Sequence, residues 1–181
     1  MRDISLHVLD LVQNSITANA SLIQLRFEYF DNNLIFKIID DGKGMGEELI
    51  NNVKSPFTTG RTTRKVGLGI PLLLANAELS GGYVDIKSTL GKGTELIACF
   101  KTDNIDCLPL GDMIGTFITL IITNPYSPEF VFSIKNSDDE FEFDTREVKT
   151  VLAGVPINEP DIIKWIDDTL KEEMQPLFGG I

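Results

Sequence analysis

The chain has 181 residues, of which 43% are hydrophobic, so it can bury one good core or a core with a small appendage. Its formal net charge of −11 argues against nucleic-acid binding, because no basic cluster lies outside residues 61–65. The most apolar run, residues 113–122, is too short to cross a bilayer and no signal peptide is recognised, so we expect a cytoplasmic protein without membrane contact.

The first predicted element is a helix over about residues 3–18. Its apolar side chains recur with helical spacing and form one stripe toward the core: Ile4, Val8, Leu9, Val12 and Ile16. Asp10 and Asn14 are four residues apart, so a helix places both on one face, which can simply be its solvated face. However, Asn is a poor filler for a helix interior, and an amide oxygen suits a magnesium ion that also binds phosphates. We therefore favour a binding role for this pair.

Two predicted strands follow, over about residues 22–30 and 33–40. The second strand runs into Asp40, Gly42 and Gly44, which form an Asp-x-Gly-x-Gly pattern that precedes Met45. Such a strand delivers a carboxylate to the floor of a pocket, and the glycines let the backbone turn sharply close to a ligand. An ordinary turn is the competing interpretation. Because a buried carboxylate without a partner is costly, we favour a binding role for Asp40.

A threonine-rich polar segment separates two predicted helices, over about residues 46–53 and 69–80. It carries three cationic side chains, which can close over a polyphosphate as a lid or simply remain solvated: Arg61, Arg64 and Lys65. Residues 67–69 stand immediately before the second helix, where free N–H groups and the helix dipole favour phosphate. The segment therefore combines a candidate lid with a candidate phosphate site.

The remaining part of the chain begins with two predicted strands, over about residues 83–88 and 94–101, and a linker over residues 103–111. Beyond the linker we expect a helix, a hairpin and a second helix, over about residues 112–123, 130–143 and 159–174. No recognisable chemistry lies in this last part. It can complete the core of the preceding domain or form a docking or dimerisation module, and we favour the module slightly.

The glycine clusters do not fit the commoner nucleotide-binding motifs. Residues 67–72 lack the third glycine of the dinucleotide motif, and residues 91–94 lack the leading glycine and the Lys-Ser/Thr order of a P-loop. Residues 40–45 lack the spaced oxygen ligands of an EF-hand. Each motif is weak by itself, but four motifs in a fixed order are hard to explain as ordinary turns.

In that order the motifs resemble those of the GHKL superfamily, which includes DNA gyrase, the ninety-kilodalton heat-shock chaperones, MutL and histidine-kinase catalytic domains. Five segments carry the resemblance to its N box, first glycine box, phenylalanine box, second glycine box and closing threonine motif: residues 9–20, 40–44, 55–60, 67–69 and 91–94. The resemblance covers roughly residues 1–101. It implies an α+β fold, a two-layer α/β sandwich known as the Bergerat ATP-binding fold. We expect this domain over residues 1–102 and a small C-terminal α+β module over residues 106–181.

The resemblance also implies that the cofactors are ATP and Mg²⁺, and it assigns a role to each motif. Asn14 would be the metal ligand, and Asp10 would occupy the position of the catalytic general base, where many relatives carry Glu. Asp40 would accept a hydrogen bond from the adenine amino group, supported by Thr94 on the facing strand. The full set of implied ATP-binding residues is Asn14, Asp40, Gly42, Gly44, Met45, Phe57, Arg61, Arg64, Lys65, Gly67, Leu68, Gly69 and Thr94.

The motifs are most similar to those of histidine-kinase catalytic domains and anti-sigma serine kinases. This similarity favours transfer of the terminal phosphate of ATP to a partner protein, which the sequence does not identify. A slow ATPase that acts as a conformational switch and a nucleotide-sensing module without turnover are the alternatives. A homodimer is compatible with each of them. His7, the only histidine, lacks a phosphoacceptor sequence around it, so we expect it in the core or on a helix surface.

Overall fold

The computed structural model describes residues 1–54 and 68–179. Its strands are β1 (Leu22–Phe30), β2 (Asn33–Asp40), β3 (Tyr83–Thr89), β4 (Gly93–Lys101), β5 (Glu129–Lys135) and β6 (Glu140–Asp144). Its helices are α1 (Ile4–Thr17), α2 (Glu47–Lys54), α3 (Gly69–Leu79), α4 (Met113–Thr123), α5 (Thr145–Leu152) and α6 (Pro160–Thr169). After α6 come a π-helical turn, Leu170–Met174, and a 3-10 turn, Gln175–Phe178.

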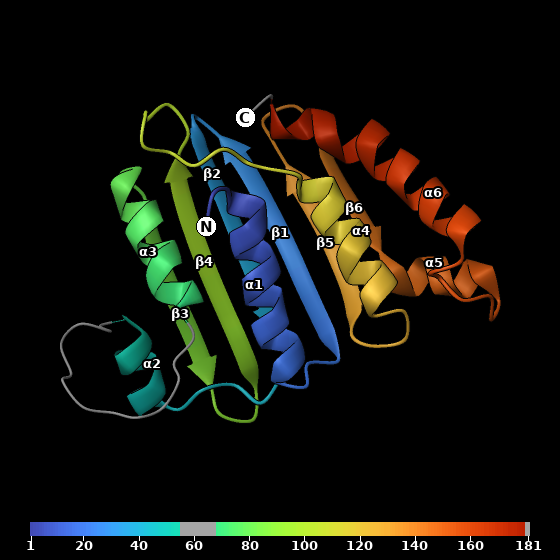
Figure 1. The fold of residues 1–181 in the computed structure, drawn as a ribbon, viewed down its shortest axis with the longest axis horizontal. Coiled ribbons are helices and arrows are strands. Elements are labelled where there is room, and N and C mark those ends of the chain that lie inside the picture. The colour runs from blue at the N-terminus through green and yellow to red at the C-terminus, as the bar shows by residue number, and fades with distance from the viewer. Residues whose placement is uncertain (55–67, 180–181) are drawn as a thin grey trace.

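The six strands form one sheet in the order β3-β4-β2-β1-β5-β6, and α1, α3 and α4 lie on the same face of it (Figure 1). Burial alternates along β2, where Leu34, Phe36 and Ile38 point into the core and their neighbours are partly exposed. Helices on one face of a mixed sheet make the two-layer α+β class that the sequence predicts. Within the described residues, no helix is long and apolar enough to span a membrane.

The antiparallel register of the central strands places the predicted site residues side by side. Asp40 at the end of β2 stands opposite Thr94 on β4 and opposite Ile23 on β1. The tight turn between β1 and β2 uses Asp31 and Asn32, both with positive φ, which are among the residue types that tolerate this conformation best. Sheet register therefore brings Asp40 and Thr94 together from positions that are far apart in the sequence.

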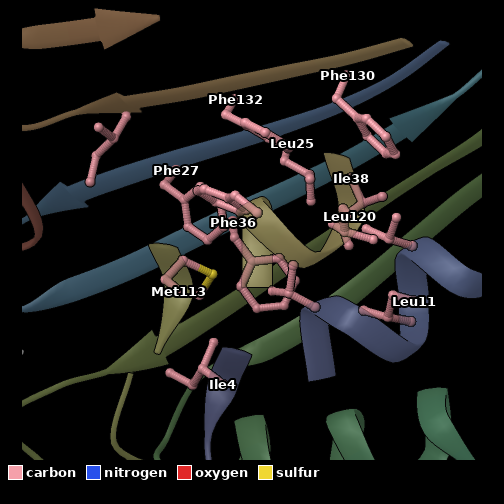
Figure 2. Close-up of a cluster of buried hydrophobic side chains, with 14 of the residues drawn as sticks. Ile4, Leu11, Leu25, Phe27, Phe36, Ile38, Met113, Leu120, Phe130 and Phe132 are labelled. Atoms are coloured by element: carbon pink, nitrogen blue, oxygen red, sulfur yellow. The ribbon is translucent and has the colours of Figure 1, made fainter. Parts of the chain in front are cut away.

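The C-terminal strands extend the same sheet, because β5 pairs in parallel with β1 from Leu22 opposite Glu129 to Glu28 opposite Lys135. Figure 2 shows side chains of α1, β1, β2, α4 and β5 in one apolar cluster. The ring of Phe27 on β1 lies 5.8 Å from that of Phe117 on α4, centroid to centroid. The sheet and the core thus continue across the domain boundary that the sequence predicts between residues 102 and 106. This continuity is expected if residues 106–181 complete the core of the preceding domain. The division of the chain into two modules stays a prediction.

Candidate functional site

Asp40 is the buried centre of the predicted site, with 9% of its surface exposed. The Ser15 hydroxyl, on the buried side of α1, donates a hydrogen bond of 2.7 Å to Oδ2 of Asp40. The backbone N–H of Gly42 donates to Oδ1 over 2.9 Å. A carboxylate has about four acceptor positions, so these two donors leave Asp40 able to accept further hydrogen bonds from a ligand. Helix α1 and the turn after β2 therefore hold the carboxylate ready for an external donor.

The neighbouring strands supply a small hydroxyl cluster next to Asp40. The Ser88 hydroxyl on β3 lies 2.9 Å from the Thr94 hydroxyl and donates to the Gly93 carbonyl over 2.9 Å. The backbone N–H of Met45 donates to the same Ser88 oxygen over 2.8 Å. Ser88 thus fixes Thr94 and the chain after the glycine turn in one arrangement.

Two glycines are required where the chain turns after Asp40. Gly44 has φ of 63°, and a Cβ at this position would collide with the Thr89 carbonyl group and approach the Gly93 oxygen to 3.0 Å. A Cβ on Gly42 would lie 2.9 Å from the Ala18 oxygen and 3.0 Å from Oδ1 of Asp40. Close backbone packing therefore explains the two glycines of the Asp-x-Gly-x-Gly pattern.

Helix α1 presents the two other predicted polar residues. Asn14 is exposed and Asp10 is partly buried, and their spacing puts them on one face of the helix. The Asp10 carboxylate lies against Gly69, the first residue of α3, so closely that a Cβ on Gly69 would overlap it. The structure therefore joins the predicted N box to the second glycine motif through this contact.

A cavity of about 470 Å³ lies where strands β2 and β3 end and β4 begins. Asp40, Ser88, Gly93 and Thr94 line it, together with Ile50 from α2. A cavity of about 380 Å³ around Tyr29, at the other end of β1, contains none of the predicted site residues. The predicted adenine-binding residues thus open onto a cavity of their own.

Some of the predicted residues cannot be placed. Phe57, Arg61, Arg64, Lys65 and Gly67 lie outside the described residues. Leu68 precedes α3 and is 72% exposed, and Met45 packs against the core. The structure therefore brings together Asp40, Gly42, Gly44 and Thr94, and it brings Asp10 to Gly69. The lid and the phenylalanine motif remain predictions.

His7 is buried between α1 and α3, where its Nε2 lies 2.9 Å from the side-chain nitrogen of Asn76 and its Nδ1 has no partner among the described residues. Burial, aided by the positive N-terminal amino group and partly opposed by Asp3, lowers the His7 pKa from 6.5 to about 4. In the unfolded chain this pKa returns to 6.5. Between these two values the unfolded state therefore binds more protons, and stability falls as the pH falls.

We expect the free energy of unfolding to drop by about 3 kcal/mol through His7 alone as the pH falls from 6.5 to 4. Denaturant unfolding at several pH values measures this change. His7→Gln keeps a polar group for Asn76 but does not titrate, so its stability should depend less on pH in this window. Equal pH slopes for the two proteins would contradict the assignment.

Matches to known proteins agree with this geometry. Residues 2–104 match the family described as histidine kinase-, DNA gyrase B-, and HSP90-like ATPase. The chain is 30% identical over 66 residues to sporulation kinase D of Bacillus subtilis strain 168, covering 36% of this chain and 13% of that protein. It is 29% identical over 98 residues to the sensor histidine kinase YvrG of the same strain, covering 51% and 17%. It therefore spans only a small part of these curated relatives.

A solved structure described as the N-terminal domain of a DNA repair protein has the same fold, with a TM-score of 0.54 and 16% identity. The similarity covers 78% of this chain and 52% of that one. This share of the chain is larger than the family match, so the common fold extends past residue 104. The family match covers more than half of the chain, and the chain belongs to the family of histidine kinase-, DNA gyrase B- and HSP90-like ATPases.

Proposed function

We propose that this protein binds ATP with Mg²⁺ and transfers the terminal phosphate of ATP to a partner protein. The observation that carries the ATP site is the buried Asp40 carboxylate, held by Ser15, opposite Thr94 and open to a cavity. In this proposal Asp40 accepts a hydrogen bond from the adenine amino group, and the Thr94 hydroxyl supports that contact. The match to kinase sequences favours transfer over simple hydrolysis.

The other predicted residues act at the phosphate end. Asp10 accepts the proton of the attacking hydroxyl as general base, and Asn14 provides an amide oxygen for Mg²⁺. The exposed position of Asn14 on α1, next to Asp10 on the same face, fits both roles. Gly69 begins α3 beside Asp10. In this proposal Arg61, Arg64 and Lys65 close over the phosphates as a lid, while Phe57 belongs to the phenylalanine motif and Gly67 to the second glycine motif.

The residues present fit a magnesium ion that is bound mainly through the nucleotide. Among the described residues, no group of three or more His, Cys, Asp or Glu side chains could hold a metal by itself. Mg²⁺ usually keeps few protein ligands and takes phosphate oxygens as the others, so one amide from Asn14 is compatible with this mode. When bound, the ion would neutralise charge on the phosphates.

Asp40→Asn should remove most of the stabilisation by ATP without unfolding the protein. Oδ1 of Asn can still accept from Gly42, and the Ser15 hydroxyl can accept from the new amide group. The N–H groups of the new amide would, however, face the N–H groups of the adenine amino group, and two donors cannot form a hydrogen bond with each other. Wild-type protein at about one hundred times the dissociation constant of ATP should gain about 2.7 kcal/mol, and Asp40→Asn should lose this gain.

Thermal unfolding with and without magnesium-ATP checks this expectation. Asp31→Asn is the matched control, because it makes the same chemical change on an exposed turn and Asn tolerates the positive φ there. An undiminished ATP-induced shift in Asp40→Asn would remove Asp40 from base recognition. Steady phosphate release without phosphorylation of a partner would indicate an ATPase instead of a kinase. ATP binding without phosphate release or phosphate transfer would indicate a nucleotide-sensing module.

A further inference from the structure

Asp41, the residue after Asp40, has no role in the proposed chemistry, yet its carboxylate is engaged by three donors. Oδ1 accepts from the backbone N–H groups of Ser21 and Leu22 over 2.7 and 2.9 Å, and Oδ2 accepts from the Ser21 hydroxyl. Burial alone would raise the Asp41 pKa, but these hydrogen bonds hold it below its usual range. The carboxylate therefore ties the glycine turn to Ser21 and to Leu22, the first residue of β1.

The same attachment continues into the C-terminal strands. The carbonyl oxygen of Ser21 accepts a hydrogen bond of 2.9 Å from the backbone N–H of Glu129, the first residue of β5. The Glu129 carboxylate in turn accepts from the Thr145 hydroxyl over 2.7 Å and from Lys149 over 2.8 Å, both on α5. A continuous set of hydrogen bonds therefore runs from the glycine turn through Ser21 to β5 and α5.

The backbone of Lys43 makes two further attachments of the glycine turn. The Lys43 N–H donates to the Ala18 oxygen over 2.9 Å, and the Lys43 oxygen accepts from Gly91 over 2.8 Å. These bonds fix the turn to the end of α1 and to the hairpin between β3 and β4. Only the Asp41 attachment, among these three, reaches β1 and β5. Hydrogen bonds to a charged acceptor are also the stronger kind.

We propose that Asp41 is a positioning residue of the nucleotide site, which fastens the glycine turn to β1 and, through Ser21, to β5. Nucleotide binding and docking of β5 then stabilise each other, because both depend on the same turn conformation. This inference rests on the proposed ATP binding. Its role differs from that of Asp40, because Asp41 acts on the turn and does not contact the nucleotide.

Asp41→Ala should raise the dissociation constant of magnesium-ATP about tenfold or more, since the turn loses a charge-assisted attachment. Asp41→Asn should restore most of the affinity, because its Oδ1 can still accept from both backbone N–H groups. That rescue would show that Asp41 acts through these hydrogen bonds and not through a direct effect of its negative charge on the nucleotide. Asp112→Ala is the matched control: it removes an aspartate that caps α4 through Gly115 and should leave ATP affinity unchanged.

Calorimetry gives the affinities, and circular dichroism well below the melting temperature verifies that each variant is folded. Hydrogen exchange is the second readout: ATP should slow exchange of the Glu129 amide in the wild type and less so in Asp41→Ala. Unchanged affinity in Asp41→Ala, or no effect of ATP on the Glu129 amide, would overturn the inference while leaving ATP binding intact. A wild-type protein that does not bind ATP would instead overturn the proposed function and this inference with it.

Discussion

Deletion of residues 106–181 is expected to leave a chain that does not fold and does not bind ATP. The deletion would remove β5, which pairs with the edge of β1, together with α4 and Phe178, which pack on the inner face of β1. Phe27, with 1% of its surface exposed, would lose the rings of Phe117 and Phe178, which lie 5.8 and 5.5 Å away. The free energy of unfolding of a domain is only about 5 to 15 kcal/mol. Exposing such an apolar face costs more than this. Circular dichroism, gel filtration and ATP-induced stabilisation measure the outcome.

Two point variants of the full chain measure how much the packing of residues 106–181 contributes to the free energy of unfolding. Phe132→Ala removes a fully buried ring that stacks on Phe117 at 4.2 Å and should cost about 3 to 5 kcal/mol. Tyr126→Ala changes a side chain that is 79% exposed and should cost less than about 0.5 kcal/mol. A truncated protein that is folded, soluble and able to bind ATP would instead establish residues 106–181 as a separate module.

Asp10→Asn should suppress phosphate transfer or hydrolysis by about 10² to 10⁴, the range that a well-placed general base contributes. Asn has nearly the same shape, so the contact with Gly69 and the affinity for ATP should persist. Phosphate release, and transfer once a partner is known, are measured for both proteins at saturating magnesium-ATP. Gly69→Ala provides an independent variant, because its Cβ would displace the Asp10 carboxylate without altering its chemistry, and it should also lower the rate.

Gln13→Ala is the control for this experiment, since Gln13 is exposed on the same helix and is not assigned to the site. Equal rates in the wild type and Asp10→Asn would remove Asp10 from the reaction. The acceptor would then be expected to be a histidine, because a neutral imidazole nitrogen is already nucleophilic near pH 7 and needs a base less than a hydroxyl does.

Local sequence patterns predicted the individual elements well. The strands over residues 22–30 and 33–40 occur where predicted, α1 is one residue shorter than predicted at each end, and α3 is one residue shorter at its C-terminal end. Helix α5 was missed, although Asp144 caps it and three of its residues are apolar, because eight residues show too little periodicity. The parallel pairing of β1 with β5 was missed because strand pairing depends on residues far apart in the sequence.

The same limit applies to the site. Asp40, Gly42 and Gly44 were predictable because a carboxylate and two glycines follow a strand in a fixed pattern. Ser15 and Ser88 were not, since a single serine has no motif of its own. For Ser15 a signal existed: it continues the buried stripe of Val8, Leu11 and Val12, and a polar residue on such a stripe needs a partner. That the partner is Asp40 follows only from the fold.

The parallel pairing of β1 and β5 also has a consequence for synthesis of the protein. On a ribosome, Glu129 emerges about a hundred residues after Leu22, with which it pairs. At typical translation speeds the edge of β1 that pairs with β5 therefore stays unpaired in the nascent chain for about 5 to 20 seconds. This strand carries the apolar residues Ile23, Leu25 and Phe27. An open apolar strand edge is a template for aggregation. Translation that stops between residues 104 and 129 should accordingly yield products that require chaperones or proteolysis.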